Sequence, residues 1–223
     1  MPMSPDVVSL SHQLLDAAQG QARYMVALAG PPGAGKSYGS ALLCDALNQR
    51  QPGVAAVVPM DGYHFDNAVL GEEQLPLKGA PHTFDVDGLR HDLARIRRAD
   101  RPVAVPIFDR PLDLARAGGR LITPDHRIVI VEGNYLLLDQ EPWRALRSLF
   151  DWTLFIDVED AVLAERLIQR WLCMGQDLAG AMERTHQKDM LNAALVKTRS
   201  VSPDQRWRPS LSTLSESDHD LVE

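Results

Sequence analysis

The chain has 223 residues, of which 45% are hydrophobic, enough for one domain with a sizeable core. Its formal net charge of −7 argues against a general nucleic-acid-binding protein, because such proteins are usually basic. Neither Cys44 nor Cys173 belongs to a CxxC pair, so we expect no disulfide framework and no zinc site. The N-terminal segment lacks the features of a signal peptide, and no apolar run is long enough to span a bilayer. We therefore expect a cytoplasmic protein with no membrane or nucleic-acid partner.

The first part of the chain predicts alternating helices and strands around a glycine-rich turn. A helix is expected over residues 7–18 and an apolar strand over 24–29. A further helix is expected over 40–47, followed by a β-branched strand over 54–58. The turn between the first strand and the second helix, residues 30–37, is where a phosphate-binding motif would have to lie.

That turn reads Gly-Pro-Pro-Gly-Ala-Gly-Lys-Ser and fits G-x-x-x-x-G-K-[ST], the P-loop pattern. Its glycines let the backbone aim several N–H groups at phosphate oxygens, and the following helix adds the positive end of its dipole. Lys36 can reach the outer phosphates of ATP, and the Ser37 hydroxyl can ligate Mg²⁺. The expected nucleotide-binding residues are Gly30, Pro31, Pro32, Gly33, Ala34, Gly35, Lys36, Ser37 and Tyr38.

The middle of the chain predicts less regular structure. Residues 66–87 contain several glycines and prolines and are expected to form an irregular loop. A helix capped by Asp87 or Gly88 should follow and end near residue 98. Residues 103–108 predict an edge strand, because Pro106 cannot donate within a central ladder. Gly118-Gly119 predicts a turn.

The last part of the chain again alternates. Strands are expected over 127–133 and 152–157, and helices over 143–150, 160–173 and 181–196. This alternation predicts an α/β fold, a P-loop NTPase three-layer sandwich with about five parallel strands, helices on both faces and a small lid. We expect the domain to cover residues 1–200, with the lid at about 174–184. Residues 201–223 are expected to be a partly disordered tail.

A small-molecule kinase is the P-loop chemistry that the motifs favour. The chain lacks the N-K-x-D segment of a guanine-specific GTPase and the L-S-G-G-Q-like segment of an ABC-type ATPase. A helicase or large motor would need a longer chain. A nucleotide-binding regulatory or accessory protein without kinase activity remains the alternative.

Two strand ends carry the predicted catalytic and metal-binding carboxylates. Asp61 follows the strand at 54–58 and is the candidate base for an acceptor hydroxyl, although it could simply cap the turn before Gly62. Glu132 ends a buried strand and is expected to serve Mg²⁺ with Ser37, although a buried ion pair is also open. Asp157 competes for this role, and we favour Glu132 because Gly133 would let backbone pass close to a ligand.

Three arginines flank the Gly175–Gly180 stretch and suit a lid that brings positive charge over the phosphates. Arg166 and Arg170 are the candidate catalytic cations beside Lys36, and Arg184 is a candidate nucleotide contact. Solvated arginines on helix surfaces are the alternative interpretation.

Five motifs follow one another along the chain: the P-loop, Pro59-Met-Asp-Gly-Tyr-His64, Lys78-Gly-Ala-Pro-His-Thr-Phe-Asp85, Pro106-Ile-Phe-Asp-Arg110 and Val131-Glu-Gly-Asn-Tyr-Leu-Leu-Leu138. As an ordered set, they resemble the uridine kinase, phosphoribulokinase and bacterial pantothenate kinase group, nearest its nucleoside/nucleotide kinase-like (fructose-transport-associated kinase) branch. The resemblance implies a five-stranded parallel sheet, ATP with Mg²⁺, a small hydroxyl acceptor, Asp61 as its carboxylate and, often, a homodimer.

The resemblance also places acceptor contacts in the segments matching His82–Asp85 and Phe108–Arg110. The expected acceptor-site residues are Asp61, His64, His82, Asp85, Phe108, Arg110, Glu132 and Tyr135. Arg110 stands where uridine kinases tend to carry an aromatic or small residue, and Met60-Asp61-Gly62 is more similar to pantothenate kinases. Arg110 would favour an acceptor with a carboxylate or phosphate, and nucleosides, pantothenate-like acids and sugars all remain open.

Overall fold

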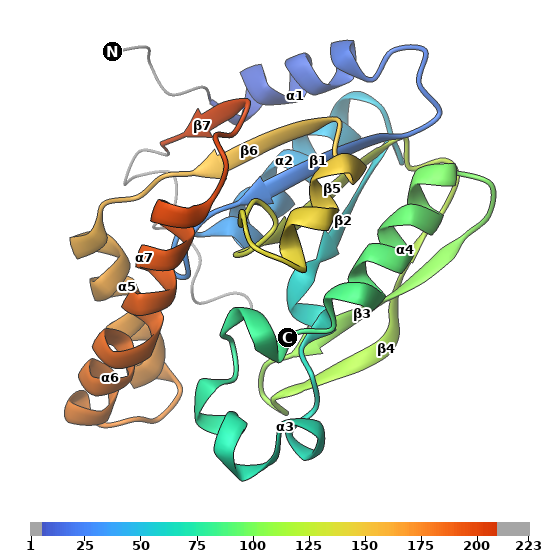
Figure 1. Cartoon of the computed structure of the whole chain (residues 1–223). Coiled ribbons are helices and arrows are strands. Elements are labelled where there is room, and N and C mark those ends of the chain that lie inside the picture. The colour runs from blue at the N-terminus through green and yellow to red at the C-terminus, as the bar shows by residue number, and fades with distance from the viewer. Residues whose placement is uncertain (1–5, 209–223) are drawn as a thin grey trace.

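The computed structural model describes residues 6–208 and has a parallel five-stranded sheet at its centre (Figure 1). The strand order is β2-β5-β1-β6-β7, and every neighbouring pair is parallel. The strands are β1 (Tyr24–Ala29), β2 (Ala55–Pro59), β5 (Ile128–Gly133), β6 (Trp152–Ile156) and β7 (Gln205–Trp207). The predicted parallel α/β sheet with about five strands is confirmed.

Successive residues of β1 face two separate hydrophobic cores. Tyr24, Val26 and Leu28 pack with α1 (Val7–Ala17), α2 (Lys36–Arg50) and α5 (Asp160–Cys173). The alternate residues of the strand pack on the opposite face with α4 (Val86–Arg98), β3 (Val103–Asp109) and the 3₁₀ segment Trp143–Leu149. Because side chains of a strand alternate between faces, a fully buried strand needs apolar cover on both sides. This arrangement is the predicted three-layer sandwich.

The strand predicted at residues 103–108 lies outside the main sheet. β3 (Val103–Asp109) pairs only with β4 (Leu114–Ile122), in an antiparallel hairpin whose register shifts between Val105 and Ile107, around Pro106. The turn predicted at Gly118-Gly119 is wrong, because both glycines lie inside β4. A Cβ on Gly119 would come 2.4 Å from Ile107 Cγ1, so this glycine lets the two strands pass closely.

The segment predicted as an irregular loop contains a helix. α3 (Asn67–Gln74) is kinked at Gly71, whose φ of 68° lies in the left-handed region, and it buries no residue. Short 3₁₀ turns follow at Leu75–Leu77 and Pro81–Thr83. α3 projects away from the sheet at the bottom of Figure 1. The lack of a buried face explains why no helical periodicity marks this segment in the sequence.

The helix predicted at 181–196 is part of a longer helical run with an irregular middle. α6 (Leu178–Arg184) continues into a π-helical turn, Thr185–Asp189, and then into α7 (Met190–Arg199). The expected lid corresponds to α6 and the turn at Gly175 before it, where φ is 87°.

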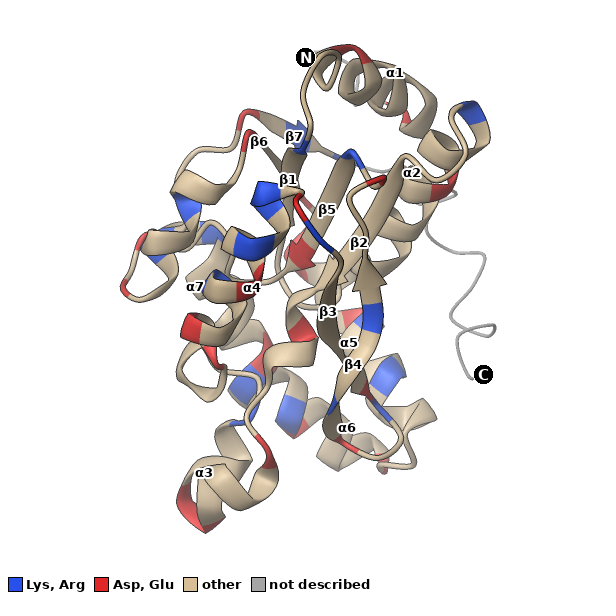
Figure 2. Ribbon diagram, turned by 90° about the vertical axis from the view of Figure 1, so that its right-hand side faces the viewer, with Lys and Arg blue, Asp and Glu red and all other residues tan. Residues whose placement is uncertain are grey.

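The sheet ends in a strand that the sequence had assigned to the tail. β7 pairs with β6, placing Trp207 opposite Ile156, and Trp207 is 2% exposed. The end of the predicted tail, residues 209–223, lies outside the described residues. Lys and Arg are interspersed with Asp and Glu along the ribbon (Figure 2). Over residues 6–208, no helix combines the length and apolar character needed to cross a membrane.

Trp207→Ala should destabilise the protein by about 3–5 kcal/mol, because it empties a buried site that Trp207 fills against Gly39 and Ile156. A Cβ on Gly39 would come 2.9 Å from the Trp207 ring, so α2 and β7 are closely packed. Chemical denaturation measures the loss. Leu191→Ala is the control, since Leu191 is 64% exposed and should change the free energy of unfolding by less than about 0.5 kcal/mol. Equal effects of the two substitutions would show that β7 does not belong to the core.

Candidate nucleotide and acceptor site

The P-loop connects β1 to α2 at the carboxyl edge of the sheet. Gly33 and Gly35 have φ of 78° and 83°, and Gly35 is the residue before the first turn of α2. Lys36 therefore lies at the helix N-terminus, where its Nζ donates to Pro31 O at 2.9 Å. Arg166 of α5 donates to Gly33 O at 3.4 Å. The loop thus presents the N-terminal amides of α2 together with two cations, an arrangement suited to phosphate. Tyr38 follows in the same first turn and is half-buried.

Glu132 lies beside the serine of the P-loop. The Ser37 hydroxyl donates to Glu132 Oε1 at 3.2 Å, and Glu132 is 5% exposed. Asp157, its competitor in the sequence, instead binds Arg208, with Nη2 2.9 Å from Asp157 Oδ2. The reason we gave for favouring Glu132 needs correction: a Cβ on Gly133 would come 2.4 Å from Met60 Cβ, so this glycine accommodates a side chain of the protein.

Asp61 lies just past β2, in the 3₁₀ turn Met60–Tyr63, and forms an ion pair with Arg110. Arg110 Nη2 is 2.8 Å from Asp61 Oδ2, and Arg110 comes from the turn between β3 and β4. Burial raises the pKa of Asp61, but Arg110, His64 and Lys36 outweigh it and hold the pKa below its usual value. Asp61 is therefore an anion at neutral pH.

The pKa values of Glu132 and Lys36 are both shifted in the direction that favours the neutral form of the group. Burial raises the pKa of Glu132 from 4.5 to about 7, and the negative charge of Asp61 adds to the rise. Burial lowers the pKa of Lys36 to about 8, although Glu132 and Asp61 oppose this. Two carboxylates close to one another thus have pKa values shifted in opposite directions, and the ion pair with Arg110 is made by Asp61.

Two of the predicted acceptor residues, His64 and Phe108, have aromatic rings in contact with one another at a tilt of 40°. His64 Nδ1 is 2.8 Å from the backbone oxygen of Asp61. Because a carbonyl oxygen can only accept a hydrogen bond, we assign a proton to Nδ1. The centroid of the His64 ring is 4.0 Å from the centroid of the Phe84 ring and 4.6 Å from that of the Phe108 ring. His64 and Phe108 thus form one aromatic wall, and Arg110 is two residues beyond it on the chain.

The remaining predicted lid arginines gather around Trp171 of α5. The guanidinium of Arg184 is 4.0 Å from the centre of the Trp171 ring and that of Arg170 is 5.5 Å from it. Trp171 Nε1 donates to Asp189 at 2.7 Å, which fixes the indole between α5 and the π-helical turn. Burial and the charge of Arg110 lower the pKa of Arg170. Arg170 is therefore an electrostatic neighbour of the Asp61–Arg110 pair.

Three predicted acceptor residues have other partners in the structure. Tyr135 is fully buried, and its hydroxyl donates to Gly79 O at 2.6 Å. His82 is exposed, with Nε2 2.8 Å from Gln74 Oε1. Asp85 accepts from Gly88 N at 2.8 Å and caps α4, a position the sequence had given to Asp87 or Gly88. Each of these contacts gives its residue a structural role.

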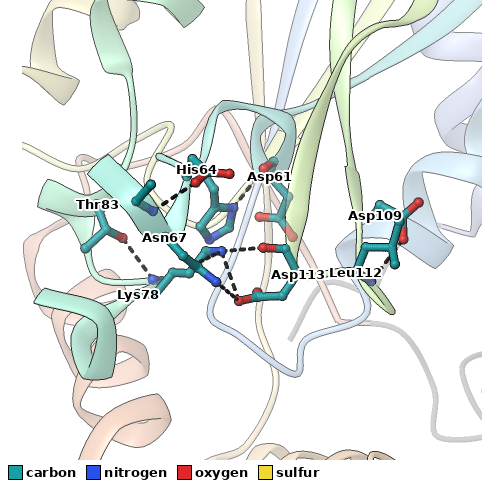
Figure 3. Close-up of polar contacts among 11 residues, drawn as sticks. Asp61, His64, Asn67, Lys78, Thr83, Asp109, Leu112 and Asp113 are labelled. Atoms are coloured by element: carbon teal, nitrogen blue, oxygen red, sulfur yellow. Dashed lines mark hydrogen bonds and ion pairs between the residues drawn. The ribbon is translucent and has the colours of Figure 1, made fainter. Parts of the chain in front are cut away.

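Sequence analysis did not identify the role of Lys78, a buried lysine that connects two segments near Asp61 and Arg110. Lys78 is 9% exposed, and its Nζ donates to Asn67 Oδ1 and to Asp113 O, both at 2.6 Å (Figure 3). The Asp113 carboxylate is 3.1 Å from the same nitrogen. Asn67 begins α3 and Asp113 ends the turn that carries Arg110, so Lys78 fastens α3 to the hairpin. Nothing in the sequence pairs these three positions.

Glu132→Gln should remove a pH dependence of stability. Because the folded state raises the pKa of Glu132 to about 7, it holds this proton more tightly than the unfolded chain does. The resulting stabilisation is present below pH 4.5 and is lost as the pH rises through 7. The wild type should therefore lose about 3 kcal/mol relative to Glu132→Gln between pH 4.5 and 8.

Urea denaturation at several pH values in this range measures the difference. Glu165→Gln is a matched control, since Glu165 is an exposed carboxylate on α5 and its loss should leave the slope unchanged. Parallel stability curves for the wild type and Glu132→Gln would contradict the raised pKa.

Comparison with known proteins gives relatives along most of the chain. The "Putative uridine kinase C227.14" of Schizosaccharomyces pombe is 36% identical over 214 residues, which are 90% of this chain and 91% of that protein. The "Uncharacterized protein YggC" of Escherichia coli is 40% identical over 172 residues, 74% of this chain and 70% of that protein. No family model matches the sequence.

A solved structure, "putative fructose transport system kinase" from Silicibacter sp. TM1040, superposes with a TM-score of 0.85 at 38% identity. The superposition covers 91% of this chain and 99% of that one. The chain belongs to the uridine kinase, phosphoribulokinase and bacterial pantothenate kinase group of P-loop kinases.

Proposed function

We propose that the protein transfers the γ-phosphate of ATP to a hydroxyl group of a small polar metabolite. The observation that carries the proposal is the position of the Asp61 carboxylate, which lies within electrostatic range of Lys36 and is paired with Arg110 at 2.8 Å. A kinase needs a phosphate cradle, a carboxylate for the acceptor hydroxyl and cations for the transferred charge. All three types of group converge at this edge of the sheet.

In this mechanism, Asp61 accepts a hydrogen bond from the acceptor hydroxyl and orients its oxygen toward the γ-phosphorus. The new O–P bond forms as the bond to the oxygen of ADP breaks, and the hydroxyl proton passes to Asp61. The low pKa of Asp61 makes it a weak base, so its main contribution is orientation. Lys36, Arg166 and Arg170 of α5, and Arg184 at the end of the expected lid stabilise the transferred negative charge.

The residues near Ser37 suit Mg²⁺, which would screen the phosphate charges when bound. A hydroxyl and a carboxylate oxygen are the ligand types this ion prefers, and Ser37 and Glu132 would hold it. Over residues 6–208, no three His, Cys, Asp or Glu side chains form a metal cluster. Magnesium sites in kinases commonly use one or two protein ligands with phosphate and water oxygens for the rest.

A nucleotide-binding regulatory or accessory protein is the second candidate. It would bind ATP on the same loop, but its hydrolysis would respond to a protein partner and not to a small hydroxyl compound. The Asp61–Arg110 pair favours the kinase, because a carboxylate held ionised near Lys36 can accept a hydrogen bond from an acceptor hydroxyl.

Asp61→Asn should reduce acceptor-dependent ADP release at least about 100-fold and leave the Kd for ATP nearly unchanged. The amide keeps the size of the side chain but accepts a hydroxyl proton poorly. Acceptor-dependent ADP release over a panel of hydroxyl metabolites, with calorimetry for ATP, measures both quantities. Asp66→Asn is the control, because Asp66 caps α3 and asparagine also caps helices. Full turnover by Asp61→Asn would rule out the assigned role.

Arg110→Ala should raise the KM for the acceptor at least about tenfold and change the KM for ATP less than about threefold. The reason is that Arg110 lies on the hairpin next to Asp61 and is not part of the P-loop. Steady-state kinetics with each substrate varied in turn gives the two constants. Arg116→Ala removes an exposed arginine from the same hairpin, where it pairs with Asp109 at 3.3 Å, and should change neither constant. Equal effects of Arg110→Ala on both constants would refute an acceptor role.

A further inference from the structure

The π-helical turn Thr185–Asp189 brings a lysine to the acceptor side of the site. Such turns insert one residue into a helix and so rotate the side chains that follow, and they are frequent at functional sites. Here Asp189 turns inward to Trp171, and Lys188 is directed toward the segment around Gly79. A Cβ placed on Gly79 would lie 4.0 Å from Lys188 Cε.

Gly79 is connected to the turn that carries Arg110 through its neighbour Lys78. Its carbonyl accepts from Tyr135, and its neighbour Lys78 binds Asp113 at the end of that turn. Lys188 interacts electrostatically with Asp113, Lys78, Arg184 and Asp189. The lysine therefore approaches the acceptor region from the lid side, whereas Arg110 approaches it from the hairpin side.

The charge on Lys188 lacks an anionic partner. Its Nζ makes no hydrogen bond or ion pair with any residue between 6 and 208, and the side chain is half-buried. The carboxylates nearby already have closer partners. Asp113 is 3.1 Å from Lys78 Nζ, and Asp189 is 2.7 Å from Trp171 Nε1. Burial, and then Arg184, lower the pKa of Lys188 to about 8. An incoming anion would relieve the cost of desolvating this ammonium.

Arg110 differs from Lys188 in this respect. Because it is already paired with Asp61, its positive charge is largely neutralised before any acceptor arrives. The preference for an anionic acceptor that Arg110 suggests in the sequence therefore needs a second cation, and Lys188 supplies it.

We infer that the acceptor carries an oxyanion, a carboxylate or a phosphate, that Lys188 binds from the lid side while Asp61 holds the hydroxyl to be phosphorylated. This inference rests on the proposed kinase function. Lys188 is then a specificity-determining residue that contacts the acceptor but not the transferred phosphate. Neutral nucleosides and free sugars would leave its ammonium without a partner and would bind weakly.

The acceptor class can be tested before the acceptor is known. A deproteinised small-molecule extract is separated on an anion exchanger at pH 7, and each fraction is incubated with the protein and γ-labelled ATP. We expect the transferred label in products made from the retained fraction. Treating that fraction with phosphatase beforehand distinguishes the two sources: loss of acceptor activity identifies a phosphate, and persistence identifies a carboxylate.

Variants at residue 188 test the assigned residue with the active fraction. Lys188→Met should raise the apparent KM for the acceptor about 10- to 100-fold and leave the KM for ATP within about threefold. Lys188→Arg, which keeps the charge, should recover most of the affinity. Arg90→Gln removes one positive charge from an exposed position on α4 and should have no effect. The unchanged ATP constant shows that Lys188→Met is folded.

The outcomes separate this inference from the proposed function. Acceptor activity in the unretained, neutral fraction would overturn the inference and leave the kinase function intact. An unchanged acceptor KM in Lys188→Met would overturn it as well, even with an anionic acceptor. Absence of labelled product from every fraction would overturn the kinase function itself, and the inference with it.

Discussion

The ion pair between Asp61 and Arg110 is the interaction on which the chemistry of the site depends. Three ionisable groups, Lys36, Asp61 and Glu132, are gathered where little water reaches, and desolvation pushes each toward its neutral form. Arg110, on a flanking hairpin, is the strongest of the charges that lower the pKa of Asp61. Asp61 keeps its charge, whereas Glu132 has a pKa of about 7 and exchanges its proton near neutrality. Two carboxylates at adjacent strand ends can therefore have two roles.

The geometry of this pair follows from the exclusion of β3 and β4 from the sheet. Pro106 cannot donate a ladder hydrogen bond, and the register shift beside it lets the hairpin cross over the 3₁₀ turn that carries Asp61. A Cβ on Gly62 would come 2.4 Å from Pro106 O, so only glycine allows this approach. The hairpin shares no strand pairing with the sheet among the described residues, but Arg120 of β4 donates to Val57 O of β2 at 2.7 Å. Lys78 holds the turn of the hairpin to α3.

The nucleotide side of the site could be predicted from the sequence because its determinants are local. Strand, loop and helix follow one another within 30 residues, and the glycines at 33 and 35 adopt the positive φ that the motif requires. The last strand and the surroundings of Asp61 could not be predicted to the same extent. β7 has three residues, and it is stabilised by pairing with β6 and by burial of Trp207. Neither of these contacts produces a periodic pattern of apolar residues in the sequence. Tyr135 is of a residue type common in binding sites, but its hydroxyl donates a hydrogen bond to a backbone carbonyl 56 residues away.

Three unfavourable local features of the chain lie in the segments that carry Lys78, Asp113 and Lys188. Asp113 adopts a left-handed φ of 51°, the helical run around Lys188 is interrupted by a π turn, and Lys78 is a buried ammonium. Each of these carries a free-energy cost, and each is held in place by contacts between segments far apart in sequence. A phosphate cradle needs backbone amides, which any sequence with the right glycines can supply. In the proposed mechanism, recognition of one acceptor among many hydroxyl compounds needs charged side chains at fixed positions, and contacts between distant segments are what can hold such side chains in locally costly conformations.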